Sequence, residues 1–315
     1  MSRNSISVAA GAVLLTAGAA WAETCGAGTA CSLPAGEYHV VTPDGDGPHP
    51  AVVVLHDAGG SAAALVEAEA IATSALSRGY AVVAPQGLDQ IMADGSAQPG
   101  WRLSGTRSGG RDDISFLERV LSDAADAHGI DPARVLVTGY GHGGALTWEA
   151  ACEHPSFAAA FAPRNGGYFG DLPAACAGSA KVLHLHAPVD GGWPLAAAVE
   201  TAEGVAPYVP VQAHLTLAAE TFGCAGTGGD TALPAGWDAV VWNGCADGAA
   251  LKLVLHPETA RTSALQIDVM IDWFEMDRMV TEEGAAAVAA TLDAEATADP
   301  VPETSAPESA EEAAE

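Results

Sequence analysis

The sequence predicts an α/β protein: a doubly wound, mostly parallel sheet with helices on both faces. Two observations carry this prediction. Residues 50–56 and 80–85 are apolar runs without polar alternation, which is typical of central parallel strands buried on both sides. A β-branched run from Arg134 ends in the glycine cluster 139–144, and an apolar, helix-competent segment follows at once. Strand, tight turn and helix in that order imply right-handed crossover connections.

The other elements follow in chain order. We expect an edge strand at 37–41, a helical stretch at about 62–77 and a glycine-rich loop at 86–110. Asp112 and Asp113 should open a helix, since Ile114, Leu117 and Leu121 follow at helical spacing and acids suit a helix start. Further strands are expected at 157–162, 181–187 and 251–256, and a closing helix at 267–276. Residues 191–248 show little periodicity and are expected to form an irregular insertion.

Both ends of the chain differ from this domain, which we place at 23–280. Arg3, an apolar stretch at 6–20 and Ala20-Trp21-Ala22 are typical of a secretory signal peptide over 1–22. Residues 281–315 hold ten acidic residues and no basic one, so we expect a disordered acidic tail. The mature protein should therefore be secreted or periplasmic.

Composition limits the partners. The net charge is −28, with 12 Lys and Arg against 40 Asp and Glu, which argues against nucleic-acid binding and against anionic membranes. Export permits disulfides, and the six cysteines form three sequence-local couples: Cys25 with Cys31, Cys152 with Cys176, and Cys224 with Cys245. Neighbour pairing is a preference among 15 connectivities. None has the C-x-x-C spacing of a zinc or redox site, and we expect no cofactor.

Five segments stand out together: VVLH at 53–56, VAPQG at 83–87, RDDISFL at 111–117, the stretch 129–144, and HLHAPVD at 184–190. In this order they resemble the secreted polyhydroxybutyrate depolymerase, feruloyl esterase and acetyl xylan esterase group of α/β-hydrolases. The resemblance implies an α/β-hydrolase fold. It also implies hydrolysis of carboxylic esters by serine, aspartate and histidine through an acyl-enzyme.

The resemblance also assigns the site. It places the nucleophile at Gly141, the acid at Asp190 and the histidine at or near Arg261. It places the oxyanion donors at the backbone N–H of His142 and at Asp57, where the family usually has glycine. The chain thus keeps the acid and departs from the family pattern at the nucleophile, the base and one oxyanion residue.

These departures predict a pseudohydrolase. Glycine has no atom for an acyl intermediate, and losing the nucleophile typically costs on the order of 10⁶ in kcat. Arg261 cannot act as a base because its guanidinium stays protonated, but it could pair with Asp190. Such a protein could bind an ester, an aryl ester, a glycan or a polyester without cleaving it.

The alternative is an active ester hydrolase with other reactive groups. Ser104, Ser108 and Ser115 lie in or near the rim loops and could supply a nucleophile. A further option is a metal-bound water held by His56, His142, Asp190 and His256. This option is weakened because His56 and His186 match histidines that serve the framework in the family. Tryptophans in the loops, namely Trp101, Trp193, Trp237 and Trp242, could form a ligand platform or cover the sheet.

Overall fold

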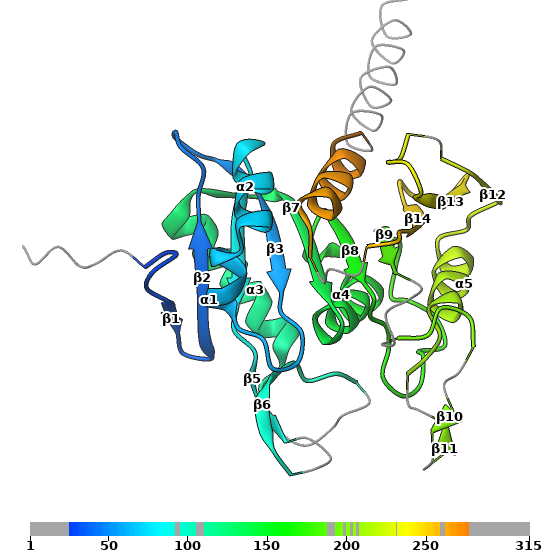
Figure 1. The fold of residues 1–315 in the computed structure, drawn as a ribbon, viewed down its shortest axis with the longest axis horizontal. Coiled ribbons are helices and arrows are strands. Elements are labelled where there is room, and N and C mark those ends of the chain that lie inside the picture. The colour runs from blue at the N-terminus through cyan, green and yellow to red at the C-terminus, as the bar shows by residue number, and fades with distance from the viewer. Residues whose placement is uncertain are drawn as a thin grey trace, which may run out of the picture.

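The computed structural model describes residues 25–91, 95–104, 110–187, 193–197, 200–201, 204–205, 208–230, 232–258 and 262–276. Its centre is one mixed sheet in the order β1-β2-β4-β3-β7-β8-β9-β14-β13-β12 (Figure 1). The strands from β4 to β14 in this order are mutually parallel, and the two pairings at each end are antiparallel. Their bounds are β1 Cys31–Leu33, β2 Gly36–Val41, β3 His49–Leu55, β4 Ala81–Pro85, β7 Ile130–Tyr140, β8 Ala160–Arg164, β9 Lys181–His186, β12 Gly226–Gly228, β13 Asp238–Asn243 and β14 Ala250–Leu255.

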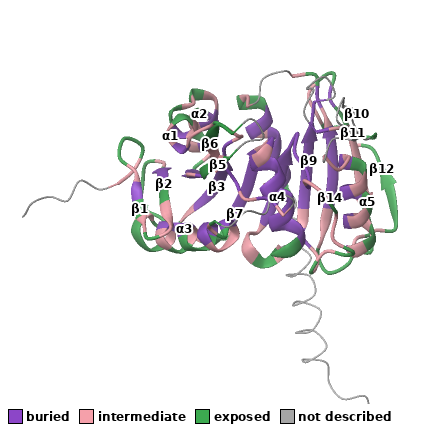
Figure 2. Cartoon of the chain, turned by 90° about the horizontal axis from the view of Figure 1, so that it is seen from below, coloured by how far each residue is buried: buried purple, intermediate pink, exposed green. Residues whose placement is uncertain are grey.

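Helices cover both faces of this sheet. One face packs against α3 (Asp113–His128), α4 (His142–Glu153) and α5 (Val211–Thr221), and their apolar residues form one buried cluster with it. The other packs against α1 (Ala62–Glu67), α2 (Glu69–Ser77) and a helix over 264–276, which form a second cluster. The central strands are buried over most of their length, as the purple ribbon in Figure 2 shows. The doubly wound, mostly parallel sheet predicted from the sequence is confirmed.

Local sequence explains several element boundaries. Asp112 caps α3, because its side chain accepts from the N–H of Ser115 at 3.1 Å, and Gly129 ends the helix with a φ of 64°. The expected helix at 62–77 is two helices that break at Ala68, whose backbone is extended. The predicted strand at 157–162 begins only at Ala160, since residues Pro155–Phe157 form a 3₁₀ turn.

Three expectations were wrong. The strand at 37–41 is not the sheet edge, because β1 pairs outside it. The loop at 86–110 contains a hairpin of β5 (Leu88–Ile91) and β6 (Ala97–Gly100). Residues 191–248 are not merely irregular: α5 lies there, and β13 and β12 extend the main sheet beyond β14. Within that segment, β10 (Glu200–Thr201) and β11 (Gly204–Val205) pair as a small hairpin. β12 is exposed and β13 is at most half-buried, so neither has a buried face that would show in the sequence.

All three neighbour-paired disulfides are present: Cys25–Cys31, Cys152–Cys176 and Cys224–Cys245. The second ties the C-terminal end of α4 to the loop before β9, and the third ties the end of α5 to the loop after β13. Both cross-links lie on the face of the sheet that carries α4 and α5, and each ties the end of one of these helices to a loop.

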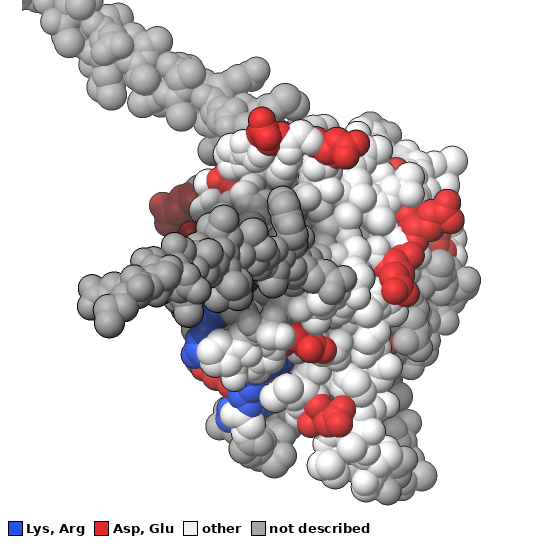
Figure 3. Space-filling model, turned by 90° about the vertical axis from the view of Figure 1, so that its left-hand side faces the viewer, with Lys and Arg blue, Asp and Glu red and all other residues white. Residues whose placement is uncertain are grey.

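The remaining sequence expectations concern the ends and the surface. The signal peptide at 1–22 and the tail at 281–315 lie outside the described residues. Within the described ranges, no helix is both long and apolar enough to cross a membrane. Figure 3 shows a face over which Asp and Glu are spread, while Lys and Arg gather in one small region, in keeping with the net charge of −28.

Candidate functional site

The candidate site lies where β7 turns into α4. β7 ends at Tyr140, Gly141 is the N-cap of α4, and the helix begins at His142. The turn packs tightly against its neighbours: a Cβ on Gly143 would lie 2.3 Å from the carbonyl oxygen of Leu55 in β3. Only glycine fits there, so the glycine cluster read from the sequence has a packing cause.

Gly141 has the backbone of a strained turn. Its φ is 56° and its ψ is −115°, a conformation that costs a residue with a Cβ roughly 1–3 kcal/mol. Its N–H donates to the carbonyl of Arg164 at 3.1 Å and its carbonyl accepts from the N–H of Ala145 at 2.9 Å. The turn is therefore held in place by backbone hydrogen bonds of Gly141, which do not depend on a side chain at this position.

The space in front of Gly141 is occupied by the carboxylate of Asp57. A Cβ built on Gly141 would lie 2.3 Å from Oδ1 of Asp57 and 3.0 Å from Oδ2. Oδ1 accepts from the backbone N–H of His142 at 3.0 Å and from that of Ala58 at 2.8 Å. We expected a backbone N–H of Asp57 to face this point; the contacts observed there are made by its side chain.

Electrostatics favour an anion at this point. The N–H of His142 belongs to the first turn of the 12-residue helix α4, whose N-terminus carries partial positive charge. Burial lowers the pKa of the His142 imidazole, an effect that the Asp57 carboxylate opposes. The ring of His142 packs edge-on against Trp193 at a centroid distance of 5.7 Å. The elbow is thus a preformed anion site that already holds a carboxylate from its own chain.

His56 supports the loop that carries Asp57. Its Nδ1 donates to the carbonyl of Asp57 at 2.7 Å, and its Nε2 accepts from the N–H of Gly87 at 2.9 Å. Trp101 lies beside the ring and donates from Nε1 to the His56 carbonyl at 2.7 Å. Both ring nitrogens are engaged, so His56 is a framework histidine. Burial lowers its pKa.

Arg164 closes the site from β8, the strand next to the elbow. Its side chain is 1% exposed, and burial lowers its pKa to about 10. Nε donates to the hydroxyl of Thr138 at 3.1 Å, and Nη1 donates to Thr262 at 2.9 Å and to Gln266 at 3.1 Å. Arg164 thereby joins the strand before the elbow to the helix over 264–276. No feature of the local sequence indicates that this cation is buried.

The other assigned residues divide into two groups. Asp190, Arg261 and Ser108 lie outside the described residues, so the proposed Asp190–Arg261 pair stays a prediction. The hydroxyl of Ser104 donates to Glu149 at 2.8 Å and that of Ser115 to Asp112 at 3.1 Å. Ser104 thus joins its loop to α4, and Ser115 bonds to the N-cap residue of α3.

Of the candidate metal ligands, Asp190 lies outside the described residues, and His56, His142 and His256 do not form a metal-binding group among the described ones. Among the described residues, the one group of three or more side chains that could hold a metal is Cys25, Cys31 and His128. His256 stacks on Trp237 at 4.9 Å, and its buried Nδ1 has no hydrogen-bond partner in the described part of the chain. Trp101, Trp193 and Trp237 are all buried and cover the sheet.

A cavity of 260 Å³ beside α3 and α4 is lined by Asp113, which was expected only as a helix start, and by Glu149, which was not expected at a site. Glu149 accepts from the N–H of Ser104 at 2.9 Å, and burial raises the pKa of Glu149 to about 7. Asp113 accepts from Arg111 at 2.7 Å, and burial raises its pKa also. These carboxyls hold the loop that leads from the β5–β6 hairpin into α3.

Comparison with solved structures gives distant matches. The acetyl xylan esterase from Aspergillus awamori is 16% identical, with a TM-score of 0.54 over 76% of this chain and 93% of that one. The Bacillus cereus carboxylesterase is 13% identical, with a TM-score of 0.46 over 76% and 94%. At this identity the first match shows the fold alone. A search of curated protein sequences found no match.

The family assignment rests on a model for the dienelactone hydrolase family, which matches residues 37–214. This range is more than half of the chain and runs from β2 through the elbow into α5. The expected polyhydroxybutyrate depolymerase group is a narrower assignment than this match supports. The chain has the α/β-hydrolase fold shared by esterases and belongs to the dienelactone hydrolase family.

Proposed function

We propose that this protein is an exported pseudohydrolase related to polyhydroxybutyrate depolymerases and feruloyl esterases, which does not carry out acyl transfer at its elbow. The observation that carries the proposal is the position of the Asp57 carboxylate. It fills the space in front of Gly141 and accepts from the N–H of His142. A carbonyl oxygen of an ester would need this same space and this same donor.

Two independent losses add up at this point. Without a hydroxyl or thiol at 141, no acyl-enzyme can form, a loss on the order of 10⁶ in kcat. With Asp57 in place, the amide that would stabilise a tetrahedral oxyanion is already bonded to an anion. A developing negative charge next to a fixed carboxylate is also disfavoured by Coulomb repulsion. Serine at 141 would displace the carboxylate from the His142 amide but leave its charge beside the elbow, so restoring the nucleophile alone should not restore activity.

Binding without cleavage remains the proposed role, with an ester, an aryl ester, a glycan or a polyester as the ligand class. Asp57 excludes the carbonyl group of such a ligand from the elbow. Contacts would then come from the rim, where the apolar side chain of Ile91 on the β5–β6 hairpin is 74% exposed. Figure 1 shows this hairpin beyond the end of β3 that leads to Asp57.

Hydrolysis of short acyl nitrophenyl esters tests the proposal. Four proteins are compared: the wild type, Gly141→Ser with Arg261→His, the same pair with Asp57→Gly, and the same pair with Asp57→Asn. We expect the wild type and the double variant to be silent and the Asp57→Gly triple variant to be active. Asparagine keeps the bulk of Asp57 beside the elbow, so that variant is the matched control and should stay inactive.

Wild-type turnover would contradict the proposal if a single rim substitution abolished it. Asp57→Asn and Ser104→Ala are the two informative substitutions, because these residues offer a carboxylate and a hydroxyl near the rim. Loss of turnover in either would establish the alternative, an active ester hydrolase with a non-standard nucleophile.

A further inference from the structure

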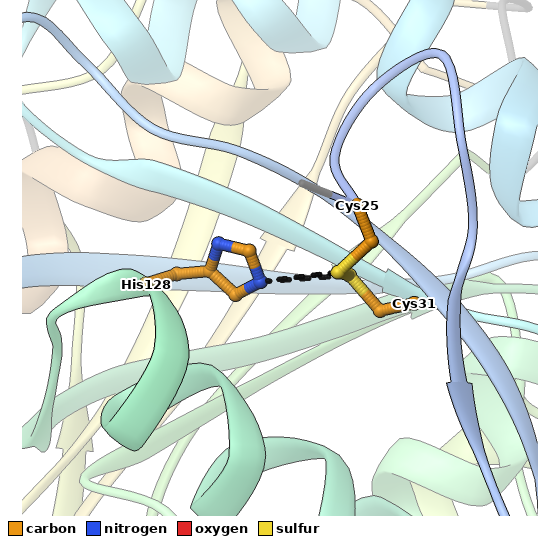
Figure 4. A group of neighbouring side chains, drawn as sticks. All are labelled: Cys25, Cys31 and His128. Carbon is orange, nitrogen blue, oxygen red and sulfur yellow. Dashed lines mark hydrogen bonds between the residues drawn. A yellow bond between two sulfur atoms is a disulfide. The ribbon is translucent and has the colours of Figure 1, made fainter. Parts of the chain in front are cut away.

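The N-terminal loop lies against the C-terminal end of α3, far along the sheet from the elbow. Cys25 and Cys31 close this loop by a disulfide, and His128 of α3 points its ring at the two sulfurs (Figure 4). Nε2 of His128 is 3.5 Å from Sγ of Cys25 and 3.5 Å from Sγ of Cys31. All three potential ligand atoms lie within 4.8 Å of one another.

Two of the three ligand–ligand distances match those of a zinc site. Zinc binds thiolate at about 2.3 Å and imidazole at about 2.0–2.1 Å in a tetrahedron, so nitrogen and sulfur ligands lie about 3.6 Å apart and two sulfurs about 3.8 Å apart. The two nitrogen–sulfur distances are already of this size. Only the two sulfurs would need to move apart, which they can do once their covalent bond is broken.

The imidazole is fixed in this orientation by its surroundings. The ring of Tyr38 packs against His128 edge-on with a centroid distance of 6.3 Å, and the Tyr38 hydroxyl donates to Asp123 at 2.6 Å.

The loop is also held by contacts that do not depend on the disulfide. Nδ1 of His39 donates to the carbonyls of Gly26 and Ala27, at 3.1 and 2.9 Å. The N–H of Gly26 donates to the carbonyl of Thr29 at 2.7 Å, and β1 pairs with β2. These bonds would keep both cysteines near His128 after reduction, so that little ordering entropy opposes metal binding.

We propose that Cys25, Cys31 and His128 form a zinc site when the disulfide between the two cysteines is reduced, with a fourth position open to water. A phosphine reductant and one water convert the disulfide to two thiols and the phosphine becomes its oxide. Zinc then binds the two sulfurs as thiolates with release of two protons, while Nε2 of His128 supplies the third ligand. The bound metal then cross-links the loop in place of the disulfide.

Cobalt is the spectroscopic probe for this site. The full-length protein is reduced with a phosphine, freed of it by anaerobic gel filtration and titrated with cobalt chloride, with circular dichroism confirming the fold. We expect a near-ultraviolet thiolate-to-cobalt absorption that saturates at one equivalent and is abolished by zinc. The oxidised protein should show none.

Matched variants show which residues give rise to the cobalt absorption band. It should be lost in Cys25→Ser with Cys31→Ser, and it should be unchanged in Cys224→Ser with Cys245→Ser. His128→Asn should weaken binding by at least about tenfold. Persistence of the band without Cys25 and Cys31, or its absence from the reduced and folded wild type, overturns the proposal.

Alkylation mapped by mass spectrometry gives a second readout that does not depend on the other disulfides. Zinc should slow iodoacetamide labelling of Cys25 and Cys31 at least about tenfold in the wild type and much less in His128→Asn. Equal labelling rates with and without zinc in the wild type also overturn the proposal.

Discussion

Replacing Gly141 by serine brings two features of the elbow into conflict. The new Cβ would lie 2.3 Å from Oδ1 of Asp57, so the carboxylate must leave, and the residue must keep a φ of 56°. The backbone conformation costs roughly 1–3 kcal/mol. Displacing Asp57 breaks its two bonds from the amides of His142 and Ala58, together worth at least about 3 kcal/mol. Gly141→Ser should therefore lower the free energy of unfolding by about 4–6 kcal/mol.

A double-mutant cycle with Asp57→Gly isolates the contact. Asp57→Gly alone loses the two hydrogen bonds, about 3 kcal/mol. The double variant loses them only once, so it should be about as stable as Gly141→Ser alone. The two substitutions should then differ from additivity by about 3 kcal/mol. Urea unfolding followed by tryptophan fluorescence, with the disulfides intact, measures all four proteins.

Two controls separate the causes. Gly141→Ala adds the same Cβ without a hydroxyl and should show the same coupling to Asp57. Gly79 has a φ of 78° and open space around it, so Gly79→Ser should cost only the backbone conformation and add to Asp57→Gly without coupling. Additivity of Gly141→Ser and Asp57→Gly to within about 0.5 kcal/mol would refute the contact on which the proposed function rests.

Three further predictions concern the rest of the fold. Burial raises the pKa of Glu149 from 4.5 to about 7, so the fold favours the neutral carboxyl. This stabilisation is complete below about pH 4.5 and is lost as the pH rises through 7. In urea titrations, the free energy of unfolding of Glu149→Gln should exceed that of the wild type by an amount that grows to about 3 kcal/mol across this range. Removing the 24-residue cross-link by Cys152→Ser with Cys176→Ser should lower the free energy of unfolding by about 3.5 kcal/mol in the same assay, and an unchanged value would contradict the chain-entropy account. Trp148→Phe removes the N–H that donates to Nδ1 of the buried His184 at 2.9 Å, and calorimetry should show a loss of about 1–3 kcal/mol; no loss would mean that water replaces the donor.

Most of the sheet could be predicted because its strands are apolar on both faces. The runs that became β3, β4, β9 and β14 carry a signal that depends on local composition alone. β12 and β13 escaped detection because they are at most half-buried and lie at the sheet edge, where the pairing partner, not the local pattern, makes the strand. The β5–β6 hairpin was missed for the same reason, since Gly100 is the only buried residue of its two strands.

The candidate site was predicted in part. The elbow was located from Gly139 to Gly144, since only glycine tolerates such close backbone approach, and this need is written into the sequence. Asp57 was noticed as a departure from the family pattern. That its carboxylate would reach Gly141 could not be foreseen, because the two residues are 84 positions apart and end different strands. The coincidence of an acid after one strand and a glycine at the elbow was the available signal.

The sequence by itself determined the fold class, the strand–turn–helix at the elbow, the absence of a side chain at 141 and the preference for neighbouring cysteine pairs, since each depends on residue type and short-range spacing. Only the tertiary structure decided what fills the space that Gly141 leaves, which cation is buried beside it, and that His128 faces the disulfide of Cys25 and Cys31. Those facts depend on distances between residues remote in the chain. The sheet sets these distances by bringing the ends of its strands to a common edge.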